Sequence, residues 1–141
     1  MEDGFDTHEL DSFLEDMMEE AQEKLPKETK KFLQKEGNKL KNKMKKKAKE
    51  VGIPQNGKTD FYDRFKRGKV YKRDGELAVR AYNGSPLGHL LEKGHRLIRN
   101  GQDVGFVKGR FYIEKSTQEF KEQYYNDTEE FIDKMLKEKG L

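Results

Sequence analysis

Two histidines and a glutamate lie close together in the second half of the chain, and they are the residues best suited to bind a metal. His89 and Glu92 stand three residues apart, which places them on one helix face, and His95 follows after three more. Two imidazoles and a carboxylate can hold zinc with one position open for water. However, the spacing matches neither two-histidine zinc-protease motif, and Gly94 is expected to end the helix before His95. We therefore interpret the three as polar contacts to nearby backbone or to a neighbouring subunit, and we predict no metal site.

The glycines Gly101, Gly105 and Gly109 superficially suggest a phosphate-binding loop. Their spacing is neither a dinucleotide fingerprint nor a P-loop, because Lys108 precedes its glycine and no Ser or Thr follows for magnesium. Turns and bulges of a hairpin explain these glycines better. No Ser–His–Asp order or nucleophile-elbow motif stands out, and the chain has no cysteine. We predict no cofactor, no catalytic residue and no enzyme activity.

The lysines from Lys27 to Lys49 suggest a second chemistry, the binding of nucleic acid. Residues 24–49 hold twelve lysines against two acids, and each phosphate contact of such a helix would release counterions. Phe32 is the only ring in this block and arginine is missing, although both residue types are expected where bases are stacked or read. A solvated face, or a face paired with the acidic N-terminal helix, is the competing interpretation.

Length and composition predict a single domain, residues 1–141, with a small apolar core. Charged residues make up 40% of the chain and apolar residues 32%, so burial in partner subunits is a further expectation. Residues 1–23 hold ten acids and no Lys or Arg. No apolar run approaches the length of a membrane span, and the acidic N-terminus does not resemble a signal peptide, so we expect a soluble chain. Within the domain we distinguish a peripheral acidic helix (1–25), a lysine-rich helix (26–51) and a sheet region with a closing helix (57–141).

Helical periodicity predicts two N-terminal helices, packed antiparallel. The first runs from Thr7 to Lys24, with Asp6 and Glu9 spaced as a capping box. The second begins at Pro26 and ends before Gly52 and Pro54. The residues expected on the buried faces are Leu10, Phe13, Leu14, Met17, Met18 and Ala21 in the first helix, and Leu33, Gly37, Leu40, Met44, Ala48 and Val51 in the second.

The rest of the chain predicts strands, a short helix and a closing helix. Asp74-Gly75 joins Lys69–Lys72 to Leu77–Tyr82 in a first hairpin, and Asn100-Gly101 joins a second. The second hairpin pairs Arg96–Ile98 with Val104–Val107. A short helix is expected at Pro86–Lys93, and a last helix from Ser116, where Glu119 would complete a capping box. The apolar face of that helix is Phe120, Tyr124, Thr128, Phe131 and Met135. The fold class is α+β, with about four antiparallel strands.

The order of the motifs carries a family resemblance. A lysine-rich helix is followed by Gly57-Lys58-Thr59, the hairpin at Lys69–Tyr82, the run Ser85–Arg96, and the block Gly105–Tyr112 that leads into the closing helix. In this order the chain resembles small phage neck proteins called tail-completion or head–tail joining proteins. These also occur in defective prophages and in phage-tail-like bacteriocins.

The resemblance implies a structural protein that forms a ring, usually a hexamer, at the head-proximal end of the tail. Its partners would be further copies of itself, the tail tube or tail terminator, head connector proteins and passing DNA, with no membrane and no cofactor. It would occur in the bacterial cytoplasm during assembly and then in the neck or collar of the virion or tail-like particle.

Two sets of contact residues follow from this interpretation. Glu92 and His95 are expected to hold a central turn, and basic residues are expected to face partners or the DNA lumen. The turn set is Pro86, His89, Glu92, Gly94 and His95, and the basic set is Lys39, Lys43, Lys46, Arg96, Arg99, Lys108 and Arg110. The alternative function is a small basic protein that binds nucleic acid through the helix Lys27–Lys49.

Overall fold

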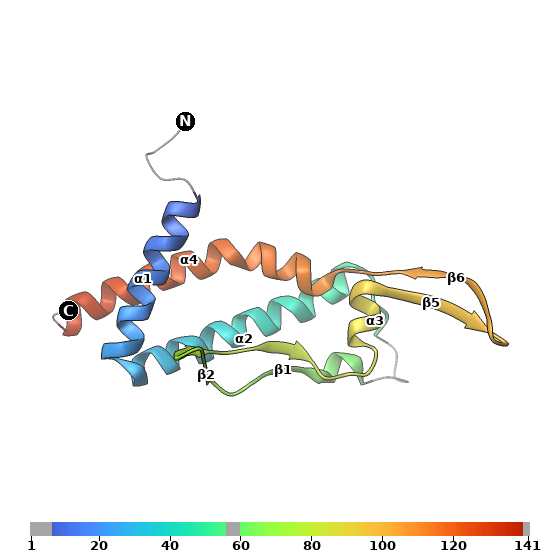
Figure 1. The fold of residues 1–141 in the computed structure, drawn as a ribbon, viewed down its shortest axis with the longest axis horizontal. Coiled ribbons are helices and arrows are strands. Elements are labelled where there is room, and N and C mark those ends of the chain that lie inside the picture. Colours follow the sequence, from blue (N-terminus) through green and yellow to red (C-terminus); the bar gives the residue numbers. More distant parts are fainter. Residues whose placement is uncertain (1–6, 56–59, 140–141) are drawn as a thin grey trace. The chain divides into compact units, whose positions relative to one another are not determined.

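The computed structural model describes residues 7–55 and 60–139. The described chain divides into two compact units, each assembled from separate segments. The first comprises residues 7–36, 69–79 and 121–139, and the second comprises residues 37–55, 60–68 and 80–120. Helices and short antiparallel strands make this an α+β fold, as predicted (Figure 1). None of the described helices is long and apolar enough to cross a membrane.

The two N-terminal helices have the predicted bounds. Helix α1 runs from Thr7 to Lys24 and α2 from Pro26 to Glu50. Pro26 occupies the first turn of α2, where its missing N–H costs no helix hydrogen bond. Leu25 alone joins the two helices. The capping box proposed for α1 involves Asp6, which lies outside the described residues.

In the first unit, Met17 and Ala21 of α1 line a common hollow with Ile132, Met135 and Leu136 of α4 (Tyr112–Lys139). The buried residues of this unit's core are Leu14, Met18, Ala21, Leu33, Ile132 and Met135. The Phe32 and Phe131 rings stack with centroids 4.5 Å apart. Phe13, predicted to be buried, is 53% exposed, because the buried face of α1 is centred on Leu14, Met18 and Ala21.

The first hairpin also belongs to this unit and consists of β2 (Tyr71–Arg73) and β3 (Glu76–Ala78). Asp74 and Gly75 both have positive φ, 53° and 83°, as the predicted tight turn requires. The Gln22 side-chain oxygen accepts the Leu77 N–H at 2.5 Å and thereby ties the hairpin to α1.

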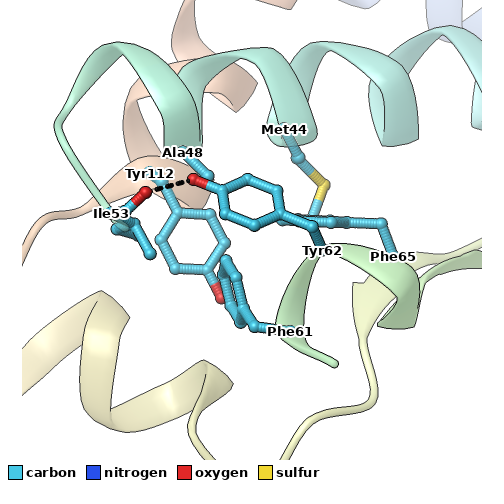
Figure 2. Close-up of a cluster of buried hydrophobic side chains, with 7 residues drawn as sticks. All are labelled: Met44, Ala48, Ile53, Phe61, Tyr62, Phe65 and Tyr112. Atoms are coloured by element: carbon cyan, nitrogen blue, oxygen red, sulfur yellow. Dashed lines mark hydrogen bonds between the residues drawn. The ribbon is translucent and has the colours of Figure 1, made fainter. Parts of the chain in front are cut away.

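The second unit is built around an aromatic cluster. The 3-10 helix η1 (Phe61–Arg64) and strand β1 (Phe65–Arg67) bring three rings against Tyr112 at the start of α4. Phe61 meets Tyr62, Phe65 and Tyr112 edge-on, at centroid distances of 5.1, 5.2 and 5.6 Å. Figure 2 shows the complete cluster, whose remaining members are Met44, Ala48 and Ile53.

The strands are more fragmented than predicted, because the described residues form six strands in three two-stranded sheets, and four of these strands have only three residues. Strand β1 pairs antiparallel with β4 (Ala81–Asn83), and the region around Phe65 was not recognised as a strand. The predicted run Leu77–Tyr82 is interrupted at residues 79–80, between β3 and β4. Periodicity alone does not reveal such a break, since the apolar residues continue through it.

The short helix and the second hairpin follow one another directly. Helix α3 spans Gly88–Lys93, so it begins two residues later than predicted and ends at Gly94 as predicted. Strand β5 (Gly94–Arg99) pairs antiparallel with β6 (Gln102–Lys108) across the predicted turn at Asn100 and Gly101. The register shifts opposite the Leu97–Ile98 step, which confirms a bulge near Gly105.

Helix α4 begins at Tyr112, one turn before the predicted start at Ser116. Ser116 is buried inside the helix, and its hydroxyl donates to the Ile113 carbonyl at 3.0 Å. The predicted capping box of Ser116 with Glu119 is therefore wrong. The side chain that caps this helix comes from another element, as the site below shows.

Candidate functional site

The carboxylate of Glu92, in the last turn of α3, caps the N-terminus of α4. Its Oε1 accepts the Ile113 N–H at 2.8 Å, and its Oε2 accepts the Glu114 N–H at 3.0 Å. These are the second and third helical residues, whose amides have no partner within the helix and are the usual targets of an N-cap side chain. The residue at the N-cap position is Phe111, which has no acceptor in its side chain. Glu92, only 8% exposed, supplies the missing cap and places a negative charge at the positive end of the helix.

The backbone completes the junction in the opposite direction. The carbonyls of Leu91 and Glu92, at the end of α3, accept the N–H groups of Arg110 and Phe111 at 2.8 and 3.0 Å. The Tyr112 hydroxyl donates to the Gly88 carbonyl at 3.0 Å. Burial raises the pKa of Tyr112 above its usual value, and the negative Glu92 adds to that shift. The end of α3 and the start of α4 thus satisfy each other's unpaired groups, and we call this arrangement the α3–α4 junction.

Two glycines allow the close approach on which the junction depends. Gly94 has a φ of 85°, and a Cβ added there would overlap the Val107 carbonyl oxygen. A Cβ added at Gly109 would lie 2.5 Å from the Glu92 carbonyl oxygen. Any larger residue at either position would push the backbones apart, which explains why glycine stands at both.

The remaining histidines and the proline of the predicted turn set take less part in the junction. Pro86 and His89 are exposed, and His95 is half-buried in β5. The His95 Nδ1 atom is buried without a hydrogen-bond partner among the described residues. Because both Glu92 oxygens accept backbone amides, that carboxylate is committed to the helix cap. No group of three His, Asp or Glu side chains within residues 7–55 and 60–139 is placed to hold a metal ion.

The predicted basic residues differ in the contacts that they make. Arg110 donates from its guanidinium to the Val51 carbonyl at 2.8 Å and so fixes the end of α2. Lys43 lies 3.8 Å from the Glu119 carboxylate. Arg96 approaches Asp103 to 3.8 Å, while Lys39, Lys46, Arg99 and Lys108 are exposed. Sequence reasoning overlooked Lys47, which pairs with Glu119 at 2.6 Å and with Glu50 at 2.8 Å. Hydrogen bonds to these two carboxylates raise the pKa of Lys47.

The hairpin β5–β6 leaves apolar side chains in water. All seven residues of β6 are exposed, and Figure 1 shows the hairpin extending away from α3. Phe106 is 65% exposed and Ile98 54%, and Val104 and Val107 are exposed as well. A two-stranded hairpin is marginally stable in water, and monomeric proteins rarely display such a patch without a function for it. The sequence predicted these strands but not their exposure, since alternation does not show whether a second layer covers a strand.

A protein-family model described as "Bacteriophage HK97-gp10, putative tail-component" matches residues 11–94, which is more than half of the chain. The matched segment includes most of α1 and all of α2 and α3, and it ends at Gly94, where the exposed hairpin begins. No curated protein and no solved structure matches the chain.

Proposed function

The chain belongs to the HK97-gp10-like family of phage tail components, and on that premise we propose that it completes the tail by forming a ring at its head-proximal end. The ring would join tail to head, and the family resemblance leads us to expect six copies. Such a protein performs no reaction. Its task is to present surfaces that become buried when the particle assembles.

The observation that carries this proposal is the hairpin β5–β6, with apolar side chains on a strand exposed along its entire length. Burial of this surface is favourable by about 25 cal/mol per Å² of apolar area removed from water, so a partner gains from covering it. The hairpin is rooted in the α3–α4 junction, whose reciprocal hydrogen bonds hold it firmly. A rigid root with an exposed apolar arm suits assembly better than catalysis.

The partners in this proposal are further copies of the chain, the tail tube or tail terminator, and the head connector. The exposed Lys46 and Arg99 are available to face these partners or the DNA that passes through the ring. A free nucleic-acid binder is the weaker candidate, because Lys43 and Lys47 of the lysine block are occupied by Glu119 and Glu50.

The experiment combines a mass measurement by light scattering with negative-stain imaging of the protein mixed with tail tubes from its own particle. We expect a ring-sized oligomer, alone or at one end of each tube. A protein that neither oligomerises nor binds tube ends would refute the proposal. Tight, salt-sensitive binding of DNA by a monomer would favour the nucleic-acid alternative instead.

A further inference from the structure

One face of the hairpin β5–β6 combines apolar and basic side chains. Arg96 lies directly opposite Phe106 in the antiparallel register, and residues opposite one another point to the same face. Ile98 follows Arg96 by two residues and therefore shares that face, as does Lys108, which stands two residues beyond Phe106. A Cβ added at Gly94 would lie 3.0 Å from the Phe106 ring, which confirms the orientation of that ring. Asp103 stands directly opposite Ile98, so it also lies on this face, and its carboxylate approaches Arg96 to 3.8 Å. We call these five side chains, Arg96, Ile98, Asp103, Phe106 and Lys108, the hairpin face.

The same chain carries a surface of opposite charge around another exposed aromatic residue. Helix α1 has seven carboxylates and a single lysine, Lys24. Phe13, 53% exposed, stands three residues before Asp16 and seven before Glu20, so the three share one helix face. Asp16 and Glu20 are themselves exposed, and Glu20 also pairs with Lys24 at 2.7 Å. We call Phe13, Asp16 and Glu20 the helix face.

We infer that the hairpin face of one copy docks on the helix face of a second copy of this chain. Phe106 and Ile98 would pack around Phe13, while Arg96 and Lys108 approach Asp16 and Glu20. This inference rests on the proposed function, for which it names the contact between neighbouring copies. The charges favour this pairing, because the hairpin face has two basic groups against one acid, whereas α1 has seven carboxylates against one lysine. Two hairpin faces brought together would carry an excess of like charge and gain less. The bulge near Gly105 also disfavours extension of the sheet through the edge of β6.

A contact between two different surfaces has a consequence for symmetry. Each copy presents one hairpin face and one helix face, so every copy can bind two neighbours, head to tail. Such heterologous contacts close into a ring when the rotation between neighbours permits. A face that pairs with itself would stop at a dimer.

The test uses two charge-reversed versions of the full chain and measures mass by light scattering. The hairpin variant carries Arg96→Glu and Lys108→Glu, and the helix variant carries Asp16→Lys and Glu20→Lys. Each alone is expected to be monomeric at concentrations where the unaltered chain forms its oligomer. An equimolar mixture is expected to recover the oligomer. The intact hairpin face of one variant can bind the intact helix face of the other, and the two reversed faces again carry opposite charges.

Two controls keep the result interpretable. Lys72→Glu with Arg73→Glu makes the same charge change on exposed positions of β2 and should leave the oligomer intact. Circular dichroism must show that each variant is folded. If a charge-reversed variant unfolds, Phe106→Ser and Phe13→Ser replace it, and each should raise the concentration needed for assembly at least tenfold.

The inference is overturned if either charge-reversed variant alone keeps the oligomeric mass, if the mixture stays monomeric, or if the unaltered chain is monomeric at every concentration. These outcomes are distinct from failure of the proposed function, which is judged by binding to tail tubes. A chain that binds tube ends while both variants still form its oligomer would retain the function and use another contact.

Discussion

Replacement of Glu92 by alanine is the most direct test of the α3–α4 junction. The change removes both oxygens that accept the Ile113 and Glu114 amides, at 2.8 and 3.0 Å, and leaves two helix N–H groups without their acceptor. A hydrogen bond to a charged group contributes about 1.5–3 kcal/mol, and loss of an N-cap side chain costs about 0.5–2 kcal/mol. Because water can enter the space left by a truncated side chain, we expect a loss of about 2–4 kcal/mol, somewhat less than the roughly 3–6 kcal/mol of both bonds at full strength.

The free energy of unfolding is measured by urea titration with circular dichroism, and the result is compared with two further variants. Glu92→Gln keeps the shape and one acceptor oxygen but turns an amide N–H₂ toward the other donor, so we expect about half of the alanine effect. Glu114→Ala removes an exposed acid from the same helix turn and should change stability by less than about 0.5 kcal/mol. If Glu92→Ala also changes the free energy of unfolding by less than about 0.5 kcal/mol, Glu92 does not act as the cap of α4.

Two further predictions concern residues around the same junction. Gly94→Ala should lower the free energy of unfolding by at least about 2 kcal/mol, since φ is 85° and the new Cβ would overlap the Val107 carbonyl oxygen. Gly101→Ala is the control, because φ there is 75° but no atom lies within 4 Å of the new Cβ. It should cost only about 1 kcal/mol in the same urea assay. Burial in the fold raises the pKa of Tyr112 from 10.0, so this tyrosine ionises first in the unfolded chain. The contribution of neutral Tyr112 to folding stability is therefore fully present below pH 10.0 and is lost as the pH rises above that value. Unfolding titrations between neutral and strongly alkaline pH should show this decline, and Tyr112→Phe should reduce it; an unchanged decline in that variant would contradict the assignment.

Local signals in the sequence predicted much of the fold. The bounds of α1 follow from its apolar periodicity, and Pro26 and Gly52 frame α2. The turns of both hairpins follow from Asp74-Gly75 and Asn100-Gly101, because few other residue pairs tolerate two successive positive φ values. These features depend on interactions over a few residues, which a single sequence displays directly.

The predictions from sequence fail where the structure depends on a residue far away in the chain, or on whether another element covers a surface. The start of α4 was predicted at Ser116 because a local capping box is visible there, whereas the acting cap, Glu92, is about twenty residues away in the chain. Phe13 shares the broad apolar stripe of α1, and periodicity does not say how wide the covered part of a stripe is. Glu92 was predicted to hold a central turn, but its carboxylate partners could not be derived from spacing.

The junction and the hairpin also depend on each other. Strand β5 begins at Gly94, directly after Glu92 and Lys93, and β6 ends at Lys108, directly before Gly109 and the start of α4. Both ends of the hairpin are therefore fixed by the hydrogen bonds and close glycine contacts that join α3 to α4. A two-stranded sheet that leaves Phe106 in water gains little stability from its own side chains, so its orientation must be set from its base. Binding of a partner stabilises only the conformation that it recognises. A hairpin held at its base pays less conformational entropy on docking than a mobile one, and this is the physical advantage of placing an exposed arm on a buried helix cap.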